Sequence, residues 1–287
     1  MRNALHLVGA AFMAVALLPA GPAAAQFSFS RQEGSPELWK VCEGQDGALP
    51  EARILACSVV IDNGMLETDS NRAGAYANRA SALQDSGDLD RAIKDFNEAI
   101  RLDPKLLAAF LGRGAVFVAK GQLDFAMLDY NQAIKLSPNN ATAYFNRGTA
   151  YSMQGQYDRA VQDLDQAIRL NPKNAAAFNN RCFARAKAGQ PQLQLALADC
   201  DEALRLRPYD ADNLDTRGFA NLKLGQFDRA IADYSDALDI DPKLATSLYG
   251  RGIARLKKGD RRGSADIASA KAIKADIAEQ FARYGLR

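Results

Sequence analysis

The chain has 287 residues, and its 36 lysines and arginines nearly balance its 34 aspartates and glutamates. Without a basic excess, the composition does not favour binding to nucleic acid or to an anionic membrane. The only histidine is His6, in a segment that we expect to be removed. A Ser-His-Asp or Cys-His nucleophile and a histidine-ligated metal are therefore excluded from the mature chain. We expect no cofactor and no metal.

Residues 1–25 have the features of a signal peptide. Arg2 supplies a positive start, and the stretch from Leu5 to Leu18 is apolar but too short to span a membrane as a mature helix. Residues 23–25 are all alanine and offer a cleavage site before Gln26. An uncleaved N-terminal anchor is the alternative. We predict an exported protein, periplasmic or secreted, with no stable membrane insertion after cleavage. Without Arg2, 35 basic residues remain against 34 acidic ones.

Two short segments precede the main body of the chain. Residues 26–50 are rich in serine, glycine and proline, which predicts a flexible lead-in. Trp39, the only tryptophan, is expected to cover the open end of the main body. Residues 51–72 carry apolar side chains at helical spacing, including Ile54 and Ile61, and predict an N-terminal capping helix.

A repeat begins near Ala73 and is marked by regularly spaced prolines. They are separated by 34, 34, 36 and 34 residues: Pro104, Pro138, Pro172, Pro208 and Pro242. A fixed period of this length indicates stacked repeats, because one repeat cannot bury its apolar face alone. The predicted array covers residues 73–260, divided into 73–106, 107–140, 141–174, 175–210, 211–244 and a degenerate sixth block from 245.

Each block predicts two helices joined by a tight turn. With the proline numbered as position 32, positions 2–14 show helical spacing of apolar residues, and a glycine at position 15 ends that helix. The second helix covers positions 19–30 and ends before the proline. Four blocks have an aspartate at position 18, which we expect to cap the second helix: Asp90, Asp124, Asp158 and Asp228.

The third block shows the complete pattern of small and aromatic residues. They are Tyr144, Gly148, Tyr151, Gly155, Ala160, Ala167 and Pro172. This pattern resembles the tetratricopeptide repeat (TPR), and five blocks match it. The resemblance implies an all-α fold, namely an α-solenoid of tandem antiparallel helix pairs that forms a TPR superhelix. It also implies a binding scaffold, although such a fold names no partner by itself.

The four cysteines form two neighbouring pairs in sequence. Cys42 and Cys57 precede the repeats, whereas Cys182 and Cys200 occupy positions 8 and 24 of the fourth block and should face each other across its two helices. In an oxidising compartment we predict the disulfides Cys42–Cys57 and Cys182–Cys200, each contributing about 3 kcal/mol on the chain-entropy model. A zinc site is the competing interpretation, but the spacing does not favour it.

The last segment, residues 261–287, is predicted to form C-terminal capping helices. Ile273, Ile277, Phe281 and Tyr284 recur at near-helical spacing and indicate one apolar stripe. We expect this stripe to cover the last repeat.

Charged residues also recur with the repeat. Position 7 is arginine in every block, and position 23 is aspartate in the five regular ones. A ladder of ligand contacts is one interpretation, but structural ion pairs within or between neighbouring repeats are favoured. The predicted pairs are Arg113 with Asp129, Arg147 with Asp163, Arg181 with Asp199, and Arg217 with Asp233.

The resemblance implies that the first helix of each repeat lines a concave binding surface, through positions 2, 5, 6, 9, 12 and 13. The predicted partner-binding residues are Asn78, Leu111, Phe145, Asn146, Met153, Asn179, Asn180, Phe183, Lys187, Phe219, Lys223, Tyr249 and Lys257. Their aromatic and amide side chains suit an extended peptide. At position 13 the chain changes from Asp85 to the three lysines, so an acidic end of a ligand could lie toward the C-terminal repeats. A solvated face with unrelated charges is the alternative.

We therefore predict a non-enzymatic scaffold that binds a protein or an extended peptide in the cell envelope. A self-associating structural protein and a hydrolase that uses paired carboxylates are the alternatives. No residue is predicted to be catalytic. The partner's identity and the oligomeric state stay open.

Overall fold

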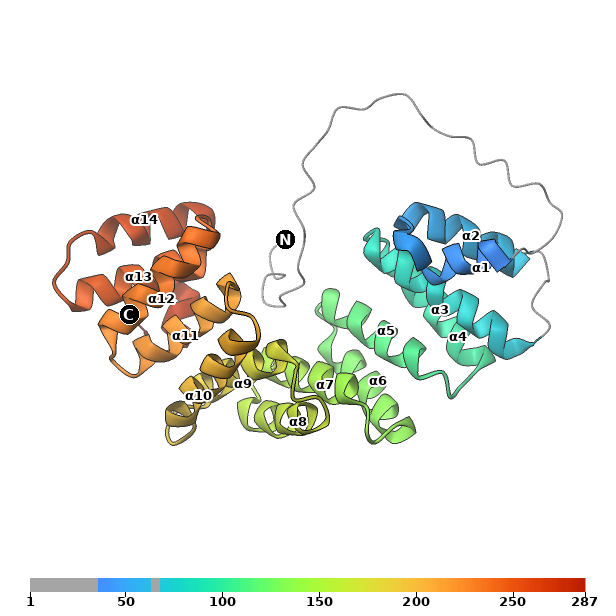
Figure 1. Ribbon diagram of the computed structural model, residues 1–287, viewed down its shortest axis with the longest axis horizontal. Coiled ribbons are helices and arrows are strands. Elements are labelled where there is room, and N and C mark those ends of the chain that lie inside the picture. Colours follow the sequence, from blue (N-terminus) through green and yellow to red (C-terminus); the bar gives the residue numbers. More distant parts are fainter. Residues whose placement is uncertain (1–35, 63–67, 287) are drawn as a thin grey trace, which may run out of the picture. The chain divides into compact units, whose positions relative to one another are not determined.

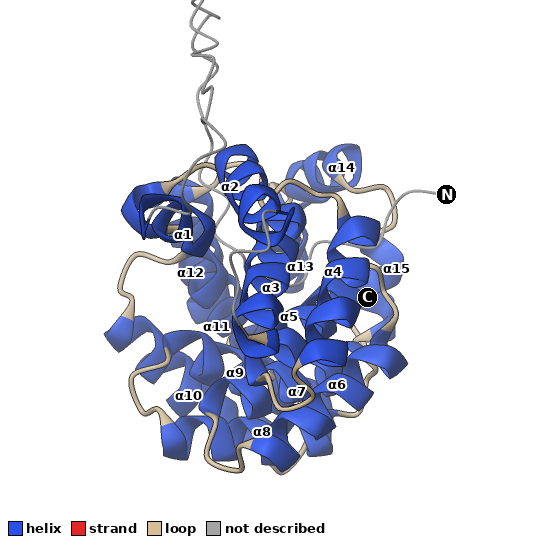
Figure 2. Cartoon of the chain, turned by 90° about the vertical axis from the view of Figure 1, so that its right-hand side faces the viewer, coloured by secondary structure: helices blue, strands red, loops and turns tan. Residues whose placement is uncertain are grey.

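The computed structural model describes residues 36–62 and 68–286, and these residues form helices and turns without any strand (Figure 2). The predicted signal peptide and residues 26–35 of the predicted lead-in lie outside them. Within the described part, no helix has the length and apolar character needed to cross a membrane. The chain divides into two compact units: unit 1 ends at Asp129, and unit 2 begins at Tyr130.

Unit 1 begins with three helices that share a small core. The helices of this unit are α1 (Pro36–Glu43), α2 (Pro50–Asp62), α3 (Asp69–Asp85), α4 (Leu89–Leu102) and α5 (Leu107–Ala119), followed by the start of α6 (Leu123–Leu136) (Figure 1). Leu38, Cys42, Cys57 and Val60 pack with Ala75 of α3. The prediction of a flexible lead-in is wrong for residues 36–43, because α1 is a helix with two buried side chains. The predicted capping segment 51–72 is also divided, since α3 already begins at Asp69.

Unit 2 is a run of helix pairs. Its further helices are α7 (Ala141–Met153), α8 (Tyr157–Leu170), α9 (Ala175–Ala188), α10 (Gln192–Leu206), α11 (Ala211–Lys223), α12 (Phe227–Ile240), α13 (Ala245–Lys257), α14 (Gly263–Ile273) and α15 (Ile277–Arg283). Each odd-numbered helix from α7 to α13 packs against the helix after it, and each second helix packs against the next first helix. The predicted division at 260 needs correction, because α14 is the second helix of a sixth pair and not a cap.

Glycine at position 15 makes the tight turn inside each pair. Gly155 and Gly225, for example, have φ of 75° and 72°, in the left-handed region that only glycine enters without strain. The predicted aspartate caps are wrong for α4, α8 and α12, because these helices begin one residue before position 18. Their aspartates lie in the first helical turn instead, where a negative charge meets the positive end of the helix dipole.

Side chains that the sequence prediction missed cap several of the first helices. Asn140, Asn174 and Asp210 each stand just before a first helix, and each side chain accepts a hydrogen bond from the backbone N–H three residues later. Such caps contribute about 1 kcal/mol each. They fix where a first helix begins and therefore which side chains it presents.

Candidate functional site

The first-helix face consists of the side chains at positions 2, 5, 6, 9, 12 and 13 of the first helix in each pair. In unit 1, Asn78 on α3 and Leu111 on α5 are both half-buried. At position 13 of α3, Asp85 forms an ion pair with Arg53 of α2 at 3.0 Å, so this carboxylate is already bound. Unit 1 thus offers mainly a polar amide and an aliphatic side chain at the predicted positions.

In unit 2, α7 and the first half of α9 carry five of the predicted residues, which we call the open patch: Phe145, Asn146, Met153, Asn179 and Asn180. All five are half-buried. Asn180 Nδ2 donates a hydrogen bond to Thr149 Oγ1 on α7 at 3.0 Å, which fixes the amide between the two helices. The Oδ1 atom of Asn179 is buried without a hydrogen-bond partner. The open patch therefore combines apolar surface with the amide groups of three asparagines.

The other predicted residues of unit 2 lie against the chain's own C-terminal segment. Phe281 of α15 has its ring centroid 4.8 Å from that of Tyr249 and 6.4 Å from that of Phe219. Tyr284, just after α15, lies 5.6 Å from Phe219 and 6.4 Å from Phe183. The stripe covers the last pair as predicted, because α15 packs on both α13 and α14. Its aromatic residues also extend over the first-helix face of α11 and α9, which the prediction did not include. Its first member, Ile273, ends α14 and stays exposed.

Two lysines of this region contact the same segment. Lys187 Nζ lies over the ring of Tyr284 and 5.5 Å from the ring centroids of Tyr157 and Phe183. Lys223 Nζ donates a hydrogen bond to the carbonyl oxygen of Tyr284 at 2.9 Å. Burial, together with the charges of Lys223 and Arg283, lowers the pKa of Lys187 to about 7. Lys257, at the same repeat position in α13, is exposed.

A half-buried acid, Asp215, lies near these aromatic residues. Ser247 Oγ donates a hydrogen bond to Asp215 Oδ1 at 2.5 Å, joining α13 to α11. Burial raises the pKa of Asp215 to about 6, although the hydrogen bond from Ser247 opposes the shift. The carboxyl is therefore bound inside the protein, and its role is to connect two first helices.

The arginines at position 7 each bind two neighbouring repeats. Arg147 donates through Nε and Nη2 to both oxygens of Asp163, at 2.7 and 2.8 Å, and through Nη1 to Asn131 of the preceding pair at 2.7 Å. The hydrogen bond to Asp163 raises the pKa of Arg147 above its ordinary value. The other predicted ion pairs are present with N–O distances of 2.5 to 2.6 Å: Arg113–Asp129, Arg181–Asp199 and Arg217–Asp233. These side chains join neighbouring repeats.

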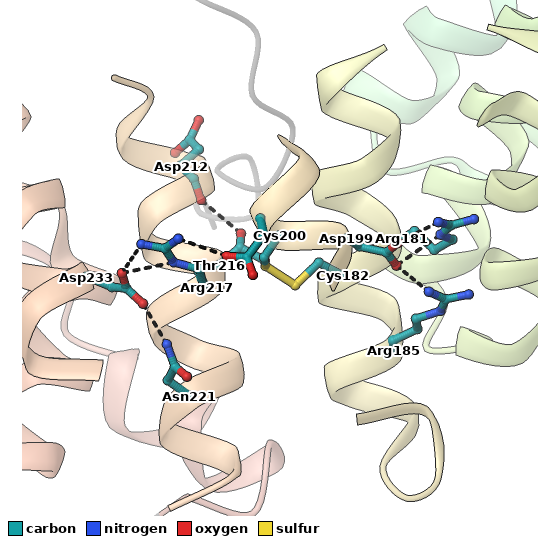
Figure 3. Close-up of a disulfide and its surroundings, with 11 residues drawn as sticks. Arg181, Cys182, Arg185, Asp199, Cys200, Asp212, Thr216, Arg217, Asn221 and Asp233 are labelled. Carbon is teal, nitrogen blue, oxygen red and sulfur yellow. Dashed lines mark hydrogen bonds and ion pairs between the residues drawn. A yellow bond between two sulfur atoms is a disulfide. The ribbon is translucent and has the colours of Figure 1, made fainter. Parts of the chain in front are cut away.

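The sequence prediction missed two members of this network. Asp266 of α14 binds Arg251 at 2.9 Å, as in the other pairs, but at a separation of 15 residues in place of 16. Arg185 adds a second guanidinium to Asp199, at 2.7 Å (Figure 3). The sixth block has one residue fewer between its arginine and its aspartate, and allowing for that shift would have identified Asp266.

Both predicted cysteine pairs are joined as disulfides. Cys182 of α9 and Cys200 of α10 have a Cα–Cα distance of 5.4 Å (Figure 3). Cys42 and Cys57 have one of 4.8 Å. All four sulfur-bearing side chains are buried. Among the described residues, no group of three or more histidine, cysteine or acidic side chains could hold a metal ion.

Comparisons with known proteins agree with this geometry. Residues 73–106 and 141–174 match the family model of the tetratricopeptide repeat, and residues 114–155 and 218–259 match a further TPR repeat model. A comparison with curated proteins gave no match.

Solved structures of repeat proteins are similar to the chain. A tetratricopeptide repeat protein from Parabacteroides merdae aligns with a TM-score of 0.66 at 19% identity, over 86% of this chain and 97% of that chain. Pseudomonas aeruginosa pilF gives 0.62 at 19% identity, over 74% and 97%. The Cut9–Hcn1 structure gives 0.69 at 18% identity, over 86% of this chain and 48% of that chain. At these identities the likeness establishes the fold alone.

Proposed function

The chain is a tetratricopeptide repeat protein, and from that premise we propose that it is a non-enzymatic scaffold that binds a protein or peptide through the first-helix face of its repeats. The open patch is the observation that carries this proposal. It lies on two consecutive first helices, α7 and α9, and holds half-buried apolar and amide side chains side by side. An extended peptide would satisfy the amides with its backbone and fill the apolar surface with its side chains.

The repeating carboxylates at position 23 favour a scaffold over a hydrolase. A glycosidase-like mechanism needs two carboxyl groups that are free to exchange protons. The position-23 aspartates instead accept two or more charge-assisted hydrogen bonds each, as Asp163 and Asp199 do. These carboxylates are bound by arginine side chains that join neighbouring repeats.

We also propose that the protein works outside the reducing cytoplasm, in the cell envelope or beyond it. Two disulfides join all four cysteines, and such bonds persist in oxidising compartments. Alkylation of the protein isolated from its native compartment, carried out in denaturant without reductant, checks this directly. No cysteine is expected to react before reduction, and alkylation of all four without reductant would contradict the proposal.

A site-specific crosslink tests the binding surface. We expect a photoreactive residue in place of Asn146, in the open patch, to capture a partner from an envelope extract. The same residue in place of Gln162, exposed on α8, is the matched control and should capture none. Equal capture at both sites would rule out the first-helix face as the binding surface. Capture of a second copy of this chain at position 146 alone would favour self-association.

A further inference from the structure

The C-terminal segment, residues 277–286, crosses three first helices of unit 2. Phe281 contacts Tyr249 of α13 and Phe219 of α11, and Tyr284 reaches Phe183 of α9. Like a cap, α15 packs on α13 and α14. A cap alone would not reach Phe183 in the fourth pair, so the segment also occupies a stretch of the first-helix face where a ligand is proposed to bind.

The segment has the form of a helical ligand. Phe281 and Tyr284 stand three residues apart, so that α15 and the turn after it present both rings on one side. Gln280 helps to hold this shape, because its Nε2 donates to Tyr284 Oη at 3.0 Å and its Oε1 accepts from Lys274 Nζ at 2.6 Å. The shape is thus set largely by contacts inside residues 274–284.

The positive charges of Lys187, Lys223 and Arg283 repel one another at this contact. Arg283 belongs to the segment, and its charge acts on Lys187, which the charge of Lys223 also affects. Within residues 36–62 and 68–286, neither Lys187 nor Lys223 forms an ion pair with a carboxylate. The aromatic contacts hold the segment, whereas the cations make the site more suitable for a negatively charged ligand.

We propose that the C-terminal segment is an internal ligand, and that the partner which replaces it is an amphipathic helix with two aromatic residues three positions apart and an acidic residue where Arg283 stands. This inference rests on the proposed function, since it names the chemistry of the partner at the same face. It also changes the expected ligand of α9, α11 and α13 from an extended peptide to a helix. The lysines at position 13 then select the acidic residue.

A peptide-binding assay on the full chain tests the proposal. The probe is a fluorescent peptide of residues 275–286 with Arg283→Glu, and the control peptide carries Arg283→Lys. We expect the Phe281→Ala/Tyr284→Ala protein, whose own segment is weakened, to bind the glutamate peptide at least tenfold more tightly than the unmodified protein does. The lysine peptide should bind several-fold more weakly, and added salt should reduce the difference. Equal binding by both proteins, or no preference for glutamate, would overturn the proposal.

Hydrogen exchange of the unmodified protein provides a second test that needs no variant. Saturating glutamate peptide should remove the protection of amides in residues 277–284, while the amides of α13 stay protected. Protection that survives an excess of peptide would identify α15 as a permanent part of the core and overturn the proposal. Capture at position 146 without peptide exchange would reject this inference alone. Peptide exchange without any capture would instead count against the open patch of the proposed function.

Discussion

The fourth and fifth helix pairs fill the same space in different ways. Positions 8 and 24 hold Cys182 and Cys200 in α9/α10, where a disulfide joins the helices (Figure 3). In α11/α12 the same positions hold Gly218 and Tyr234, and a Cβ atom added to the glycine would lie 2.9 Å from the tyrosine ring. Two small side chains with a covalent bond thus replace one buried ring packed against a glycine. The helix pair keeps its geometry with either solution, so the repeat constrains volume more than residue type.

The aspartates at position 23 differ between these pairs as well. Asp199 accepts hydrogen bonds from both Arg181 and Arg185, whereas Asp233 accepts from Arg217 and from the neutral amide of Asn221. The fourth pair therefore concentrates more charge around one buried carboxylate. Four predictions, each with a matched variant or measurement, test what these differences contribute, from the largest expected effect to the smallest.

Asp199→Ala should lower the free energy of unfolding by about 5 kcal/mol, at the upper end of the range for a broken buried ion pair, because Arg181 and Arg185 then keep only the exposed Asp165 as a carboxylate partner. Asp233→Ala should cost less, about 3 kcal/mol, since only Arg217 loses its buried carboxylate and it keeps Asp201. Urea unfolding of both variants gives the comparison. Asp165→Ala serves as the exposed control, with an expected loss below about 1 kcal/mol. Equal losses for Asp199→Ala and Asp233→Ala would show that the second arginine contributes nothing.

Replacing Cys182 and Cys200 together by alanine should cost about 3 kcal/mol, because the bridge closes a loop of 18 residues in the unfolded chain. Urea titrations with and without reductant separate this bridge from Cys42–Cys57. The Cys42→Ala/Cys57→Ala variant, which keeps the bridge in α9/α10, is the matched control. An alanine variant as stable as the oxidised protein would mean that packing alone fills this space.

Lys187→Met should stabilise the protein at pH 7, because folding removes the Lys187 charge from part of its water. Solvent still screens part of this penalty, so the expected gain is roughly 2 kcal/mol. The pKa of Lys187 falls from 10.5 to about 7 in the folded protein, through burial first and then through Lys223 and Arg283. The folded state therefore disfavours the charged form, and the penalty is complete below about pH 7 and disappears as pH rises to 10.5. The gain in melting temperature should show the same dependence on pH.

The matched variant for this pH series is Lys223→Met, at the same position of the fifth pair. It should destabilise the protein, since Lys223 donates a hydrogen bond to the Tyr284 carbonyl. If both variants shift the melting temperature in the same direction, the proposed difference between a destabilising Lys187 and a stabilising Lys223 is wrong.

Tyr234→Phe should have the smallest effect, a gain of about 1 kcal/mol. The hydroxyl of Tyr234 is buried without a hydrogen-bond partner, and its removal eliminates a desolvation penalty while the ring stays in place. Burial also raises the pKa of this hydroxyl well above its ordinary value. Calorimetry of the variant gives the sign, and a clear loss of stability would indicate that the hydroxyl has a partner such as a buried water.

The repeat period explains why so much of unit 2 could be predicted. A spacing of 34 residues assigns every side chain a position, and this alone brought Cys182 to Cys200 and Arg147 to Asp163. The period carried no information outside the repeats. Pro36 belongs to the serine-, glycine- and proline-rich stretch that predicts a flexible lead-in, although proline also suits the first turn of a helix, where it begins α1.

The position of the C-terminal segment could not be predicted for a different reason. The apolar stripe that contains Phe281 and Tyr284 shows that one face must be buried, but it does not say against which helices. The helices that bury the stripe are set by the aromatic residues of α9, α11 and α13. The repeat positions of these same residues predict contact with a partner. The same residues therefore fit both an internal and an external ligand, and only the folded structure shows which of them is in place.

The arginines at position 7 have a mechanical consequence. Arg217 is bonded to Asp233 in its own pair and to Asp201 in the pair before it, at 2.6 and 2.9 Å. A pulling force on unit 2 cannot detach one helix without breaking bonds that its neighbour shares. In an optical trap we would look for extension in discrete steps, each releasing a whole pair and adding about 110 Å of contour length. The spacing of the arginine–aspartate pairs along the sequence would then set the length gained in each unfolding step.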